Sequence, residues 1–152
     1  MADIIAFDPG YATGIASGIF DDDSPLELTG VVVIPYEDWW YAFKTLSSGR
    51  ADHVVAEQFE LNSGNEFTAD LTGVKVEGTL DLLYGSDLVY RPRSSKVQVP
   101  DELLRKIGWW QTGKDVSWSD GRDANDAIIH MLGHVAFGLK HKPTLAAYFK
   151  ND

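Results

Sequence analysis

The chain has no cysteine among its 152 residues. This excludes disulfide bonds and thiolate metal sites, and it is typical of a protein from a reducing compartment. No apolar run approaches the roughly 20 residues that a membrane-spanning helix needs. The first 20 residues also lack the basic start and the long apolar stretch of a signal peptide, and Asp3 and Asp8 interrupt them. We therefore expect a cytoplasmic protein with no membrane partner.

Lysine and arginine are scarce over most of the chain, and the formal net charge is −10. Such acidity argues against a polyanionic partner such as DNA. The basic residues are unevenly placed, however: residues 91–122 hold 7 Lys or Arg and 4 Asp or Glu, whereas residues 1–90 hold 3 and 16. A basic segment beside many carboxylates is compatible with a metal-dependent nuclease, although a solvated surface would show the same pattern.

The composition and the apolar patterns predict one α/β domain over residues 1–152. With 44% hydrophobic and 24% charged residues, the chain can bury a core of ordinary size. Short apolar runs bounded by turn residues predict strands over 3–8, 15–20, 26–35 and 53–59, and a fifth strand that runs into a basic loop over 87–98. Helical spacing predicts helices over 36–46, 68–85, 100–108 and 122–142, the last ending before Pro143. This order predicts a five-stranded mixed sheet whose first three strands are antiparallel, with helices on its faces.

Four carboxylates stand where these elements should converge. Asp8 ends the first strand, and Glu57 lies near the end of the fourth. Asp123 and Asp126 share one face of the last helix, with His130 a further turn along. Most have an ordinary explanation, as a turn residue, as partners of the helix dipole or as a core histidine. Glu57 is harder to explain, because it follows the apolar run of a buried strand.

Taken together, the four carboxylates predict a metal site. Clustered carboxylates repel one another and are tolerated mainly when a divalent cation neutralises them. Oxygen ligands of this kind favour Mg²⁺ or Mn²⁺ over zinc. Two such ions, roughly 3.5–4 Å apart, form the clamp used for in-line phosphodiester cleavage.

Three segments carry a resemblance to a known family. They are "IIAFDPGYATGIA" (4–16), "HVVAEQF" (53–59) and "GRDANDAIIH" (121–130). In order and spacing they resemble the signature of RuvC-like Holliday junction resolvases, which belong to the RNase H-like, or retroviral integrase, superfamily. The likeness is to compact bacteriophage versions, which also carry a lysine-containing loop such as "RPRSSK" (91–96). It extends over nearly the whole chain, from about residue 2 to residue 140.

The resemblance implies an RNase H-like fold and an endonuclease that resolves four-way DNA junctions in recombination or phage DNA processing. It implies two Mg²⁺ ions, for which Mn²⁺ can substitute, and no nucleotide cofactor. It also implies a homodimer that cuts branched DNA symmetrically, in a bacterial host's cytoplasm if the chain is encoded by a phage. The metal ligands implied are Asp8, Glu57, Asp123 and Asp126.

The resemblance also assigns residues to the DNA. Lys96 is expected beside the scissile phosphate, and Arg91 and Arg93 along the DNA path. Phe59 and Phe67 are candidates for opening the junction centre, although both could equally be core residues. His130 is a candidate neighbour of the metal ligands with no assigned role.

Other interpretations remain open at this stage. The same metal site could serve an exonuclease, a flap or fork nuclease, or an RNase. A nucleotide-binding protein of the actin and sugar-kinase type would need a second domain, for which 152 residues leave no room. A relative that binds DNA without cutting it is disfavoured because all four carboxylates are present. Gly10 and Gly14 are interpreted as room for a phosphate backbone to approach. The paired tryptophans at 39–40 and 109–110 are interpreted mainly as core, with a dimer contact or base stacking as the alternative.

Overall fold

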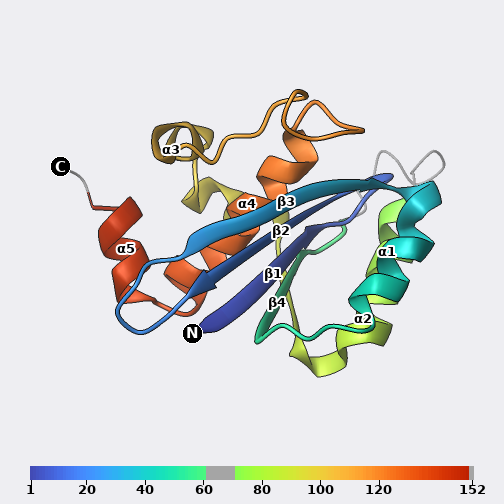
Figure 1. Cartoon of the computed structure of the whole chain (residues 1–152), viewed down its shortest axis with the longest axis horizontal. Helices are drawn as coiled ribbons and strands as arrows, with labels where there is room; N and C mark the ends of the chain where they lie inside the picture. Colours follow the sequence, from blue (N-terminus) through green and yellow to red (C-terminus); the bar gives the residue numbers. More distant parts are fainter. Residues whose placement is uncertain (61–70, 151–152) are drawn as a thin grey trace.

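A computed structural model describes residues 1–60 and 71–150 and contains a five-stranded mixed sheet in the order β3-β2-β1-β4-β5 (Figure 1). The strands are β1 (Ala2–Asp8), β2 (Ala12–Phe20), β3 (Glu27–Pro35), β4 (His53–Glu57) and β5 (Leu88–Arg91). The first three form an antiparallel meander, and β4 and β5 run parallel to β1. The parallel pairing brings the carboxyl ends of β1 and β4 to the same edge of the sheet. The predicted sheet is confirmed.

Helices cover both faces of this sheet (Figure 1). On one face, α1 (Trp39–Leu46) and α2 (Thr72–Tyr84) pack on apolar side chains such as Phe7 and Val54. On the other face, α4 (Arg122–Gly133) lies across β1 and β2. The shorter helices are α3 (Asp101–Ile107) and α5 (Lys142–Tyr148), with 3₁₀ turns at Tyr36–Asp38, Gly85–Asp87 and Arg93–Gln98 and a π turn at His134–Gly138. Among the described residues, no helix is both long and apolar enough to cross a membrane.

The alternation of side chains along β1 determines what each face receives. Ile4 and Ala6 lie in the core beneath α4, whereas Phe7 lies in the core beneath α1 and α2. Since side chains two residues apart share a face, Asp8 belongs with Ile4 and Ala6 on the α4 side. The same rule places Glu57 of β4 with Val55, which also lies beneath α4. The sheet therefore directs both carboxylates toward one helix.

The predicted helix over 122–142 is helical as far as Gly138 and wrong beyond that residue. Helix α4 ends at Gly133, a π turn follows, and the chain reverses near Lys140, which has a left-handed φ of 54°. Pro143 lies in the first turn of α5, a helix that the sequence did not reveal. Proline is tolerated there because the first turn of a helix leaves its N–H groups unpaired. The residue therefore starts a helix where it was expected to stop one.

The segment over 87–98, predicted as a strand that runs into a basic loop, is a short strand followed by a basic 3₁₀ turn. Strand β5 ends at Arg91, directly before Pro92, and residues 93–98 form a 3₁₀ helix. Proline has no N–H to donate to the sheet, so the ladder ends there. This turn brings Lys96 back toward α4.

Gly14 has a different purpose from the one expected. A Cβ at this position would lie 2.0 Å from the carbonyl oxygen of Asp123, so the start of α4 occupies the space beside the glycine. A Cβ on Gly10 would meet only the carbonyl oxygen of Ala12, at 3.2 Å, within its own turn. The close approach at Gly14 therefore serves helix packing, and the interpretation as room for phosphate is wrong there.

Gly14→Ala is expected to destabilise the protein by about 1–3 kcal/mol or more, because the backbone of α4 must move to admit a methyl group. Gly78→Ala is the matched control, since Gly78 lies inside α2 with nothing within 4 Å of its Cβ position. That change should stabilise the protein by about 0.5–1 kcal/mol through helix propensity. Urea unfolding of both variants measures the difference. Equal stability of Gly14→Ala and the parent would contradict the packing described here.

Candidate active site

Three carboxylates meet where β1, β4 and α4 converge. Asp8 and Glu57 end their strands on the α4 side of the sheet, and Asp126 lies in the second turn of α4. Ligand oxygens of these three residues all lie within 4.8 Å of one another. Residues 8, 57 and 126 are far apart in the sequence, so this proximity is a product of the fold. We call these three residues the carboxylate cluster.

Asp123 flanks the carboxylate cluster one helical turn before Asp126. Its side chain is half-buried, and its Oδ2 accepts a hydrogen bond from Ser119 Oγ at 3.0 Å. Burial raises the pKa of Asp123, and the charge of Asp126 raises it further. The hydrogen bond from Ser119 lowers the pKa but does not cancel the increase. The charge of Asp123 in turn helps to raise the pKa of Asp8. The fourth predicted carboxylate is therefore electrostatically part of the site.

Asp8 is the least stabilised carboxylate of the cluster. Burial raises its pKa well above the usual range, and the negative charges of Glu57, Asp126 and Asp123 raise it further. The positive charge of Lys96 acts in the opposite direction, but it does not compensate. A charged carboxylate in this position needs additional positive charge.

Glu57, in contrast, is well compensated. Burial acts to raise its pKa, but the hydrogen bond with His130, the charge of Lys96 and the hydrogen bond from Arg93 lower the pKa to about 2. His130 Nε2 lies 2.8 Å from Oε2, Arg93 Nε 3.0 Å from Oε1, and Lys96 Nζ 3.5 Å from Oε2. Glu57 is therefore held as a carboxylate at any physiological pH.

Two cations pair with Asp126. Lys96 Nζ lies 3.0 Å from its Oδ2, so this lysine joins two members of the cluster. Arg122 Nη2 lies 2.8 Å from its Oδ1, while Nη1 of the same guanidinium donates to Asp101 Oδ2 at 3.0 Å. Arg122 was not singled out from the sequence, although its i,i+4 spacing to Asp126 is a signal for an ion pair on a helix.

These residues fit a hard divalent cation. The donors are carboxylate oxygens, which such ions prefer, and three of them already converge. The raised pKa of Asp8 marks the place where positive charge is missing. A cation bound by Asp8, Glu57 and Asp126 would supply that charge.

Comparison with known proteins places this site in a known architecture. No protein-family model and no curated protein sequence matches the chain. Among solved structures, Thermus thermophilus RuvC in complex with a Holliday junction substrate is similar over 94% of this chain and 98% of its own, with a TM-score of 0.65 and 12% identity. The chain has a RuvC-like resolvase fold.

Two further structures share the RuvC-like fold. The yeast mitochondrial Holliday junction resolvase Ydc2 has a TM-score of 0.62 at 15% identity, covering 97% of this chain and 84% of its own. The fowlpox virus resolvase, solved with its substrate Holliday junction DNA, has a TM-score of 0.51 at 16% identity, covering 82% of this chain and 94% of its own. At these identities the likeness is one of fold. It confirms the predicted RNase H-like class.

Within the RuvC-like fold, Arg91 of β5 lies inside the protein. Its side chain is buried, with 8% exposed, and Nη2 donates to Gln98 Oε1 at 2.7 Å. Arg91 pairs with Glu57 across β4 and β5, so it points to the same side, where it packs against Gly133 of α4. Strand alternation therefore turns Arg91 inward, and its place along a DNA path stays a prediction. Arg93 is exposed, as expected.

Of the two phenylalanines predicted to open the junction centre, Phe59 belongs to the described residues. Phe59 is half-buried, its ring lies against Gly73 of α2, and its N–H donates to Glu77 Oε1 at 2.6 Å. It follows β4 and packs between that strand and α2. Phe67 lies outside the described residues.

His130 is a neighbour of the carboxylate cluster and not a member of it. The side chain is fully buried in α4, and its Nε2 faces Glu57 Oε2. A hydrogen bond of this kind orients a carboxylate toward a metal, as the outer partners of ligands do. Sequence spacing put His130 one turn after Asp126 but could not reveal its partner on β4.

His130→Leu is expected to weaken divalent-cation binding by roughly 10–100-fold, because Glu57 loses the partner that orients it. His130→Gln keeps an N–H donor on a side chain of similar reach and should recover most of the affinity. Isothermal titration of Mg²⁺ into each protein measures the effect without depending on activity. Equal loss of affinity in the two variants would show that the histidine contributes packing alone.

Proposed function

We propose that this protein is a Mg²⁺-dependent, structure-selective endonuclease that cleaves branched DNA, with the four-way junction as its substrate. One observation carries the proposal: three carboxylates, one half-buried and two buried, converge at the edge of a RuvC-like sheet. The three solved proteins named above as similar in fold are a RuvC and two Holliday junction resolvases. Mn²⁺ is expected to replace Mg²⁺, since both favour oxygen ligands.

Asp8, Glu57 and Asp126 would hold the cation, and Asp123 stands beside them for a second one. When bound, divalent cations activate water and stabilise the leaving oxygen in phosphodiester hydrolysis. The chain's own residues prepare the site for this chemistry. His130 and Arg93 fix both oxygens of Glu57, so that this ligand is oriented before any cation arrives.

Positive side chains beside the carboxylate cluster suit a phosphate. Lys96 and Arg122 approach the cluster from the 3₁₀ turn after β5 and from the start of α4, and Arg93 adds a third charge. In the described structure these cations pair with carboxylates. A cation bound to the carboxylates would take over this neutralisation and leave the basic side chains available for the negative charge of the DNA. The net charge of −10 is therefore compatible with DNA binding when the site is loaded.

Gel analysis of a synthetic four-way junction with Mg²⁺ tests the proposal. Paired nicks at symmetric positions are expected, because a homodimer would place two sites across the junction. Blunt duplex, flap, fork and RNA–DNA hybrid of matched length are the comparison substrates. If any of these is cut faster than the junction, that structure and not the junction is the preferred substrate. Shortening of duplex from its ends would identify an exonuclease. Sedimentation analysis tests the dimer independently.

A further inference from the structure

The loop between α3 and α4 presents an exposed tryptophan one residue before Ser119, which contacts Asp123. Trp118 is 68% exposed, and its backbone has a left-handed φ of 70°. Left-handed φ is a genuine outlier for a bulky residue other than glycine. Both the strained backbone and the exposed indole are unfavourable, so packing within the chain does not explain this residue. Such outliers point to function when the surrounding structure imposes them.

The loop imposes the position of Trp118 because it is fixed on the protein. The N–H and Oγ1 of Thr112 both donate to Asp115 Oδ2, at 2.8 and 2.9 Å. Val116 is buried in a small cluster with Val33 of β3 and Ala124 of α4. The tryptophan is thus displayed by an anchored turn.

On its other side the loop is tied to the site. Ser119 Oγ donates to Asp123 Oδ2 at 3.0 Å and accepts from the N–H of Gly121 at the same distance. Trp118 is the residue directly before this serine. The indole is therefore held one residue away from a side chain that contacts a predicted metal ligand.

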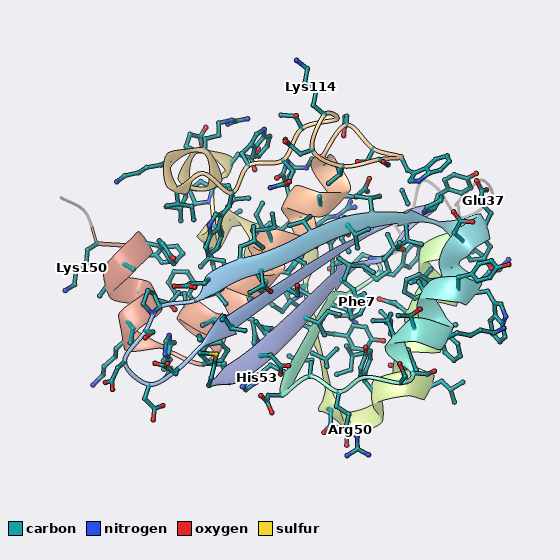
Figure 2. The ribbon with its side chains drawn as sticks, in the orientation of Figure 1. Phe7, Glu37, Arg50, His53, Lys114 and Lys150 are labelled. Carbon is teal, nitrogen blue, oxygen red and sulfur yellow. The ribbon has the colours of Figure 1, made fainter. Side chains whose placement is uncertain are left out.

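The surroundings of Trp118 suit a flat, partly apolar group. The loop and the end of β3 border an open pocket of about 340 Å³, lined by Val32, Pro35, Asp38 and Trp118 among others. Val32 contributes exposed apolar surface to it. Lys114 projects from the same loop away from the body of the protein (Figure 2). An exposed aromatic face is the feature on which single-stranded nucleic acid stacks, because every base offers a face for stacking.

We propose that Trp118 stacks on an unpaired or splayed base of the DNA beside the scissile phosphate. The inference rests on the proposed function in assuming that the carboxylate cluster acts on DNA. It assigns to the loop the selection of substrates whose bases are accessible near the cut, as they are at a branch point. Intact duplex, with its bases stacked inside, would gain nothing from this contact.

Binding of a four-way junction by Trp118 variants tests this inference, in an Asp8→Asn background so that the DNA stays intact. Trp118→Ala should weaken binding on the order of tenfold, and Trp118→Phe should recover much of it, since stacking needs an aromatic ring. Trp40→Ala is the control, because Trp40 is 59% exposed but lies on α1, on the opposite face of the sheet, stacked on Phe43. It should bind as the parent does. Fluorescence anisotropy measures the affinities, and 2-aminopurine placed beside the mapped cut reports stacking directly.

Trp118→Gly separates a binding role from a structural one. Glycine adopts φ of 70° without strain, so this variant should keep its Tm while losing DNA affinity as Trp118→Ala does. A clear fall in Tm, with affinity unchanged, would make Trp118 structural and overturn the proposal. Loss of the dimer in Trp118→Ala, seen by sedimentation, would assign the residue to a protein contact and overturn it as well.

The two proposals fail in different ways. If the parent protein cuts no nucleic acid but its affinity for the junction still falls in Trp118→Ala and recovers in Trp118→Phe, the stacking stands and the endonuclease function fails. If the parent cuts junctions with Mg²⁺ and Trp118→Ala binds and cuts them equally well, the endonuclease function stands and the stacking fails.

Discussion

Asp8→Asn is expected to lower the single-turnover rate of Mg²⁺-dependent junction cleavage by ~10³-fold or more. Removing one preorganised electrostatic partner of a transition state costs ~10²–10³-fold, and a metal ligand supports the whole site. Asparagine has nearly the same shape, so the fold and the arrangement of Glu57 and Asp126 should persist. DNA binding should remain or tighten, because one negative charge is lost. Asp22→Asn, in the exposed turn after β2, is the control for removal of a charge elsewhere.

The same substitution should make the metal-free protein more stable at neutral pH. Burial raises the pKa of Asp8 in the folded state above its value in the unfolded chain, so the folded state favours the protonated form. Stability is therefore lost as the pH rises from the unfolded value, about 3.9, through the raised folded value. Asparagine never ionises and avoids this loss. Thermal unfolding in EDTA should show a higher Tm for Asp8→Asn at pH 7, and a difference that disappears at a pH below both values.

Mg²⁺ should reverse the order of the two proteins. A ligand that binds only the folded state raises Tm with its concentration, so the parent should gain stability and Asp8→Asn should gain little. Cleavage by Asp8→Asn at the parent rate would show that the metal assignment is wrong. Equal Tm gains with Mg²⁺ in both proteins would place the cation elsewhere.

The strands of the sheet and the places of the carboxylates on their elements could be predicted from the sequence, because both depend on local patterns. Apolar runs ending in Asp8 and Glu57 define strand ends, and the i,i+3 spacing of Asp123 and Asp126 defines a helix face. Parallel pairing of β1 with β4 then brings these ends together. Each step needs only the order of elements and the alternation of side chains.

Residues whose environment depends on pairing partners could not be predicted in this way. Arg91 was assigned to a DNA path by the family resemblance, and its burial was not foreseen, because it follows from the pairing with Glu57 that turns the residue toward α4. Gly14 was interpreted as room for phosphate, but the atoms beside it come from Asp123, more than 100 residues later. The partner of His130 is likewise on a distant strand. The environment of such residues depends on strand register and long-range packing, and a local sequence pattern specifies neither.

The end of α4 is a second feature that the sequence pattern could not predict. Its apolar residues continue past Gly133 into Val135 and Ala136, which are buried, so periodicity alone predicts a longer helix. The π turn and the left-handed Lys140 end the helix instead, and Pro143 opens a new one. Proline marks a boundary in either case. Only the structure shows on which side of it the next helix lies.

Lys96→Ala is expected to lower the single-turnover cleavage rate by ~10²–10³-fold. Lys96 Nζ is the cation that touches two members of the carboxylate cluster, and its side chain is only 19% exposed. Once a divalent cation neutralises the carboxylates, this ammonium group is the basic group best placed to meet the charge that develops on the phosphate. Arg93→Ala is the matched comparison, because within the described residues Arg93 forms an ion pair with Glu57 and no other carboxylate, and its side chain is 66% exposed. Its loss should be clearly smaller.

Stability measurements distinguish this role from a structural one. In EDTA, Lys96→Ala should lower Tm, since Glu57 and Asp126 lose a shared partner while the cluster keeps its negative charge. With Mg²⁺ the bound cation replaces that charge, so most of the Tm loss should be recovered while the cleavage rate stays low. A Tm loss of the same size with and without Mg²⁺, and a cleavage rate that falls only as far as the folded fraction does, would make Lys96 a structural residue. Low activity in a protein that Mg²⁺ has restabilised would instead place the ammonium group in the chemistry.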